Sequence, residues 1–219
     1  RRYAAEPDFA AWGDRLRIHG LDLRHSPSVE LFARYLNQTE SRLDALLSNA
    51  AQTVRRPVGF YAHLLEREAL GWNALSGAEQ KLLDGHYACL SALGAPPPST
   101  SDVRALTSWD AGTTGMGLRD SARLSQLRMT YDDRSCGRDV FPDGRLDADL
   151  QQVDLRKMNT WRMALADVPT PELLEVLLIN AVAPFILAAR LKPLMLKART
   201  GAVHVVNVSA MEGVFSRGT

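Results

Sequence analysis

The stretch L-D-A-L-L-S-N-A-A, residues Leu43 to Ala51, decides the fold. Its apolar first half, Leu43 to Leu47, has the composition of a buried β-strand, and its second half, Ser48 to Ala51, contains only small side chains. Small side chains at the end of a strand pack poorly, but they allow a flat ligand to come close to the backbone. We therefore expect this strand to end at a ligand-binding edge of a sheet.

The residues before this stretch predict a strand followed by a helix. Apolar and polar residues alternate over Arg15–Leu23, which predicts a strand whose polar end is Asp22. Ser26 and Pro27 suit the start of a helix, as a capping hydroxyl and a proline in the first turn. The helix would have one apolar stripe, made by Val29, Phe32, Ala33 and Leu36. Two strands joined by a single helix are the unit of a parallel sheet.

A second helix and strand follow near the end of the chain. Thr170-Pro171-Glu172 is a good helix start, and the apolar face after it is wide, with Pro184 expected to kink the helix. Gly201–Val208 is the most strongly predicted strand, and its run of valines indicates burial on both faces. The chain is therefore expected to belong to the α/β class, with a parallel sheet flanked by helices.

A long segment of different character separates these parts. Residues 55–169 contain two predicted helices, Phe60–Leu70 and Gly77–Leu93, among turn-rich and proline-rich stretches. We expect this mainly helical segment to be an insertion that lies above the strand ends. The predicted division is 1–54 and 170–219 for the two parts of the α/β domain, with 55–169 between them. The aromatic residues Tyr61, Trp72, Trp109 and Trp161 are expected to pack the core of the insertion, and lining a substrate is the alternative for them.

Composition excludes several classes of function. The net charge of +1 gives no reason to expect a nucleic-acid partner. Cys89 and Cys136 do not form a disulfide framework, which favours a cytoplasmic location. No long uninterrupted apolar stretch is present, so no membrane association is expected. His86 and Cys89 could bind a metal from one helix, but two ligands do not make a zinc site, and no metal is predicted.

Four motifs, taken in order, resemble the short-chain dehydrogenase/reductase family. The sequence H-G-L-D-L resembles that family's strand with an adenine-bordering aspartate, and L-D-A-L-L-S-N-A-A resembles its N-N-A-G strand. The sequence L-L-I-N-A-V-A-P-F resembles its helix with an active-site asparagine, and V-V-N-V-S-A-M-E-G resembles its serine-bearing strand. The resemblance implies a Rossmann-like sheet that binds NAD or NADP and transfers a hydride between nicotinamide and an alcohol or carbonyl substrate.

The same resemblance implies roles for individual residues. The implied cofactor-binding residues are Asp22, Leu23, Asn49, Ala50 and Ala51, with Asp22 at the adenine and Asn49 and Ala50 at the adenosine ribose. The implied catalytic residues are Asn180, which would hold a water of the proton relay, and Ser209, whose hydroxyl would face the substrate. The alternative for Asp22 is a surface residue at a strand end, and for Asn49 a turn residue. For Asn180 it is a structural hydrogen bond to a neighbouring carbonyl, and for Ser209 it is a structural role, which the alanine at position 210 favours.

The chain also departs from the family. Ala51 replaces a glycine, and Ala210 occupies the position of the catalytic serine, with Ser209 one residue early. The family's glycine-rich loop would precede Arg1 and its Tyr/Lys pair would follow Thr219, so we expect a fragment that is poorly stable and inactive alone. The full-length protein could form homo-oligomers. The alternative function is a non-catalytic dinucleotide-binding or scaffold protein. An acyl hydrolase is disfavoured because no G-x-S-x-G motif is present.

Overall fold

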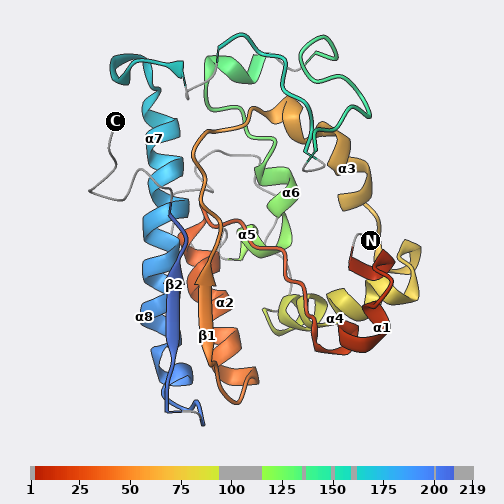
Figure 1. Ribbon diagram of the computed structural model, residues 1–219, viewed down its shortest axis with the longest axis vertical. Coiled ribbons are helices and arrows are strands. Elements are labelled where there is room, and N and C mark those ends of the chain that lie inside the picture. The colour runs from red at the N-terminus through yellow and green to blue at the C-terminus, as the bar shows by residue number, and fades with distance from the viewer. Residues whose placement is uncertain are drawn as a thin grey trace.

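The computed structural model describes residues 3–93, 115–134, 137–148, 151–158, 162–199 and 201–209. It shows a mixed α/β protein with mostly helices and a small sheet of two parallel strands. In Figure 1 the two strands lie beside one long helix, and the mainly helical segment in yellow, green and teal lies to the right and above. The α/β class is confirmed, at the level of this two-stranded sheet.

The sheet joins the two strands predicted from the ends of the chain. Strand β1 is Ala45–Ser48 and strand β2 is His204–Asn207, and they pair in parallel with Ala45 opposite His204 and Ser48 opposite Asn207. The amide of Val208 donates to the carbonyl of Ser48 at 3.1 Å, so the pairing continues just past both strands. The carboxyl ends of the strands therefore lie side by side, as the sequence predicts.

Helix α2, Ser26–Thr39, packs its predicted stripe into the core. Val29 and Ala33 are fully buried, and they contact the apolar side of helix α8, Ala183–Met195. The residue that caps α2 is His25 rather than Ser26, because the amide of Ser28 donates to His25 Nδ1 at 3.2 Å. These contacts hold α2 and α8 together behind the sheet (Figure 1).

The long helix changes its winding halfway. Helix α7, Thr170–Leu177, continues through a π-helical turn, η9 (Leu178–Val182), into α8. Pro184 lies in the first turn of α8, directly after η9, and a π turn is one of the ways in which a helix accommodates such an interruption. The predicted distortion at Pro184 is therefore absorbed in this widened turn.

The helix Thr170–Met195 spans 26 residues and, by length and composition alone, is apolar enough to cross a membrane. Several of its apolar side chains are exposed, including Leu173, Leu177 and Phe185, and the last of these is 71% exposed. Core helices of water-soluble proteins have the same length and composition. The absence of a membrane and the cytoplasmic location therefore stay predictions.

Two features of the predicted sheet are wrong. Arg15–Leu23 is not a strand: after the 3₁₀ turn η2 (Gly13–Arg15) the chain is irregular, and its amides at Ile18 and Asp22 donate to the carbonyls of Leu82 and Gly117. These two amides therefore bond carbonyls in the segment 55–169 and are not available for pairing with a neighbouring strand. Strand β2 is not buried on both faces either, because Val205 and Val206 remain 49% and 45% exposed in a sheet of only two strands.

The insertion contains the two predicted helices and several short ones. Phe60–Leu70 is observed as η3 (Val58–Tyr61) followed by α3 (Ala62–Glu68), and Gly77–Leu93 as α4 (Gly77–Ala92). Ser76 and Glu79 form a reciprocal capping box at the start of α4. The remaining short helices in the described chain are η1 (Tyr3–Ala5), α1 (Phe9–Trp12), η4 (Trp72–Ala74), α5 (Met116–Arg119), α6 (Ser121–Leu124), η6 (Tyr131–Arg134) and η8 (Leu165–Asp167).

Candidate functional site

The ends of the two strands form what we call the strand-end shelf, residues Ser48–Ala51 and Asn207–Ser209. A cavity of about 690 Å³ lies against the shelf, and we call it the shelf cavity. Its lining also includes Leu23, Ile179, Asn180 and Pro184. The structure therefore brings Leu23, Asn49, Ala50, Ala51, Asn180 and Ser209, which the sequence assigned to one site, around a single cavity.

The small residues of the shelf leave its backbone accessible. Asn49, Ala50 and Ala51 are all exposed, and Ala51 donates its amide to the carbonyl of Asn49 at 2.9 Å, which folds the chain into a tight turn. The Oγ atom of Ser48 is buried and has no hydrogen-bond partner among the described residues. A buried hydroxyl without a partner costs free energy, so the Ser48 hydroxyl is a candidate for contact with a bound ligand.

Asn180 has a bracing role that the sequence left as an alternative. Its Oδ1 accepts from the amide of Gln52 at 2.9 Å, and its Nδ2 donates to the carbonyl of Gln52 at 2.7 Å. Both ends of the side-chain amide are thus bonded to one residue just after the shelf. The arrangement holds the turn of the shelf against η9.

Asp22 is already bonded within the protein. Its carboxylate accepts from the backbone amide of Arg24 at 2.9 Å and from the Arg24 guanidinium at 2.7 Å. The side chains of Asp22 and Arg24 are only 9% and 11% exposed. Asp22 therefore lies at the edge of the site as half of a nearly buried ion pair, and an adenine contact would have to share this carboxylate with Arg24.

Ser209 lies on the shelf at the far end of β2. It is exposed and lines the shelf cavity together with Asn207, Val208 and Asn180. Its neighbour Ala210, which takes the position of the serine in the resembling family, lies outside the described residues. Cys136, Gly112, Gly115 and Gly117 were not assigned to the site, and of these Gly115 and Gly117 are described, at the start of α5.

A second cavity, of about 940 Å³, lies between the shelf and the insertion, and we call it the insertion cavity. It shares Leu23, Asn49, Ala50, Ala51 and Ile179 with the shelf cavity. Asp22 and Arg24 line its scaffold side, and Tyr61, Leu64, Leu65 and Ser121 line its insertion side. The predicted cofactor residue Asp22 thus belongs to this second cavity rather than to the first.

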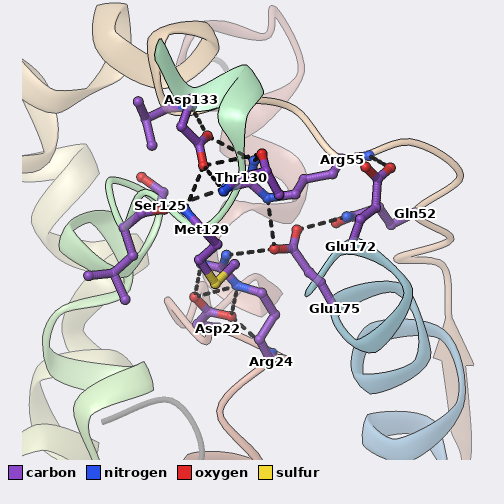
Figure 2. A network of polar contacts seen from close by, with 12 residues as sticks. Asp22, Arg24, Gln52, Arg55, Ser125, Met129, Thr130, Asp133, Glu172 and Glu175 are labelled. Carbon is purple, nitrogen blue, oxygen red and sulfur yellow. Dashed lines mark hydrogen bonds and ion pairs between the residues drawn. The ribbon is translucent and has the colours of Figure 1, made fainter. Parts of the chain in front are cut away.

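A buried ion network forms one wall of the insertion cavity (Figure 2). Arg24 Nη1 donates to Glu175 Oε2 at 3.1 Å, and Arg55 Nε donates to the same oxygen at 3.3 Å. Arg55 Nη1 also donates to Asp133 Oδ1 at 2.8 Å. The chain Asp22–Arg24–Glu175–Arg55–Asp133 therefore alternates in charge and joins the scaffold to the insertion.

The network shifts the pKa values of two of its side chains, Arg24 and Asp133. Burial opposes the charge of Arg24, but hydrogen bonds and charge from Asp22, with Glu175, raise the pKa of Arg24 above its usual value. Burial would raise the pKa of Asp133, but hydrogen bonds from Arg55, Thr130 and Met129 outweigh it and hold that pKa below its usual value. Both groups are therefore charged at neutral pH.

The same network fixes the chain that follows the shelf. Glu172 Oε1 accepts from the amide of Arg55 at 3.0 Å, and Glu175 Oε1 accepts from Gln52 Nε2 at 2.9 Å. Together with Asn180, these side chains tie residues 52–55 to α7 and η9. Arg24 and Arg55 were not predicted as site residues, although Glu172 and Glu175 on an apolar helix were a signal that buried cations would face them. For Tyr61, lining a substrate was the alternative to a packing role.

Within the described residues, no group of three or more His, Cys, Asp or Glu side chains could hold a metal ion. Comparisons with protein-family models, with curated proteins and with solved structures found no match to this chain. The geometry of the two cavities and the ordered sequence motifs are therefore the observations on which a function can be proposed.

Proposed function

We propose that the strand-end shelf belongs to an NAD(P)-dependent oxidoreductase similar to the short-chain dehydrogenases/reductases. The observation that supports this best is the shelf cavity, where Asn49–Ala51, Asn180 and Ser209 meet although they are far apart in the sequence. Parallel strands that end beside each other are the usual place for a ligand in open α/β sheets. A scattered arrangement of these residues would have removed the basis of the proposal.

The residues around the shelf fit a dinucleotide in two respects. Ala50 and Ala51 leave room beside the backbone, and the Ser48 hydroxyl is buried without a partner in the described chain. Asn49, Ala50 and Ala51 would hold the cofactor, while the Ser209 hydroxyl would face the reacting oxygen of an alcohol or carbonyl substrate. The bound dinucleotide would supply the hydride donor or acceptor, and the protein would supply position and electrostatic environment.

Calorimetric titration with NAD⁺ and NADPH tests this proposal, and Ala50→Leu is the variant to compare. Ala50 is exposed and lines both cavities, so the larger side chain occupies ligand space without disturbing the core. Overpacking costs about 1–3 kcal/mol, which corresponds to roughly 5- to 150-fold in the dissociation constant. Ala74→Leu is the matched control, because Ala74 is exposed in η4 and lines neither cavity. Failure of the unaltered full-length protein to bind either dinucleotide would refute the proposal.

A second candidate function is a dinucleotide-binding or scaffold protein without catalysis. The hydrogen bonds of Asn180 favour it, because one donor and one lone pair of its amide bond the backbone of Gln52, which gives Asn180 a structural role without catalysis. The two candidates differ in turnover. Oxidation of NADPH by the full-length protein in the presence of aldehydes or ketones supports the enzyme, and binding by the full-length protein without any oxidation supports the non-catalytic protein.

A further inference from the structure

The insertion cavity has one apolar wall and one polar wall. Leu21, Leu23, Leu64, Leu65 and Ile179 supply apolar surface. The buried ion network supplies the polar wall, and its groups are held by several bonds each, as Figure 2 shows for Arg24, Arg55 and Glu175. Ligand cavities typically combine apolar surface with a few fixed polar groups, and the volume of about 940 Å³ lies within their usual range.

The charges of this wall compensate one another. Arg24 is paired with Asp22 and Glu175, and Arg55 is paired with Glu175 and Asp133. Arg56, another lining residue, pairs with Asp154 at 2.8 Å. Glu68 is exposed to solvent at the end of α3. A charged ligand would have to compete with these pairs or lose its own hydration, which is costly in a partly buried site. The cavity therefore favours a neutral ligand.

Among the residues that the structure describes, no group accepts a hydrogen bond from the Tyr61 hydroxyl. Tyr61 lines the cavity from the end of η3. Burial, and then the charge of Glu175, raise the pKa of Tyr61 although the arginines around it act in the opposite sense. The phenol is therefore neutral at physiological pH and is able to donate to an acceptor.

We propose that the insertion cavity binds a small neutral molecule with an apolar body and a carbonyl or hydroxyl oxygen, which accepts a hydrogen bond from Tyr61. Binding of such a molecule does not require a dinucleotide. Its interpretation as the alcohol or carbonyl substrate rests on the proposed function, since the cavity shares the wall Asn49–Ala51 with the shelf cavity. The packing role predicted for Tyr61 is thereby extended: its ring contacts Phe60 at 5.2 Å between centroids, and its hydroxyl would serve the ligand.

The test uses three probes of similar shape, without dinucleotide: acetophenone, ethylbenzene and benzoate. Their binding is measured by ligand-observed NMR on the full chain and on two variants, Tyr61→Phe and Tyr87→Phe. Tyr87 packs against Trp72 and lines a different cavity, so its variant is the matched control. Removing only a hydroxyl leaves the ring packing in place, and an unchanged thermal melt verifies that each variant is folded.

We expect acetophenone to bind more tightly than either ethylbenzene or benzoate. Tyr61→Phe should weaken acetophenone by about 2- to 10-fold, the usual net effect of one hydrogen bond, and should leave ethylbenzene unchanged. Equal binding of acetophenone to Tyr61→Phe, a loss seen with Tyr87→Phe instead, or preference for benzoate would each overturn the proposal. Because no dinucleotide is present, these outcomes are independent of whether the shelf binds NAD(P).

Discussion

Replacing Arg55 with methionine tests whether the buried ion network stabilises the protein. The Arg55 side chain is 4% exposed, and its guanidinium compensates Asp133, which is fully buried, and Glu175, which is 7% exposed. Methionine has a similar length but no charge, so the substitution leaves two buried carboxylates with less compensation. Breaking a buried pair by removing one partner costs about 3–5 kcal/mol.

The hydrogen bonds that remain place the expected loss at the lower end of that range. Asp133 still accepts from the amides of Met129 and Thr130, at 2.7 and 3.0 Å, and Glu175 still accepts from Arg24. We therefore expect Arg55→Met to lower the free energy of unfolding by about 3 kcal/mol at pH 7. Adding Asp133→Asn should recover part of this loss, because the second change removes the uncompensated charge.

Urea unfolding measures both changes, and Arg190→Met is the matched control. Arg190 pairs with Glu30 at 2.7 Å, but its side chain is 59% exposed, so this surface pair should contribute less than about 1 kcal/mol. The reasoning is refuted if Arg55→Met lowers the free energy of unfolding no more than Arg190→Met does.

Acid should also lower the free energy of unfolding of the unaltered protein. The pKa of Asp133 is lowered in the folded state, so its contribution is present above about pH 4 and is lost as the pH falls through the folded-state value.

Two further predictions concern the shelf and the histidines. Asn180→Ala removes both hydrogen bonds to the backbone of Gln52, so amide hydrogen exchange at Gln52 should accelerate. The control Asn37→Ala removes a side-chain amide that bonds Ala33 and Arg190, and it should leave exchange at Gln52 unchanged. Equal exchange at Gln52 in both variants would contradict the bracing role. Burial lowers the pKa of His86, helped by His19, and burial lowers the pKa of His19, helped by Arg17 and opposed by Glu40. The folded state therefore favours the neutral form of both rings, and the free energy of unfolding should fall as the pH drops below about 6.5, where the unfolded chain takes up protons. In urea unfolding, the double variant His19→Phe/His86→Phe should show a weaker dependence of this free energy on pH. An unchanged dependence would contradict the prediction.

Local patterns were sufficient to predict the elements that define the scaffold. The stripe Val29–Leu36, the short apolar run before Ser48 and the valine run before Asn207 are each visible in the local sequence. The predicted strand ends placed Asn49–Ala51 and Ser209 at one edge of the sheet, and the resemblance to the short-chain dehydrogenases/reductases added Asn180; these residues line one cavity. Their chemical roles are a separate question, which the binding and turnover experiments address.

The predictions failed where hydrogen bonds and ion pairs form between residues that are far apart in the sequence. Alternation over Arg15–Leu23 suits a strand, but it also suits an extended chain laid against helices, and the carbonyls of Leu82 and Gly117 lie far away in the sequence. The pairing of Arg24 with Glu175 has no local signal either, because any buried cation could have satisfied that acid. Sequence periodicity identifies helices, strands and their apolar faces. Which groups bond each other across the molecule depends on how residues 55–169 pack.

The π turn Leu178–Val182 has a consequence for how the long helix tolerates change in length. One residue advances an α-helix by about 100°, so deleting a single residue in α7 or α8 would rotate the two halves against each other by that angle. A π turn holds about one more residue per turn than an α-helix, so deleting one residue in η9 would restore regular winding and leave the two halves near their present orientation. Glu172 and Glu175 must face residues 52–55, while Ile186 and Leu191 must face α2. A helix rotated by a deletion in α7 or α8 could keep only one of these sets of contacts, whereas the extra residue of η9 could be lost with both sets kept.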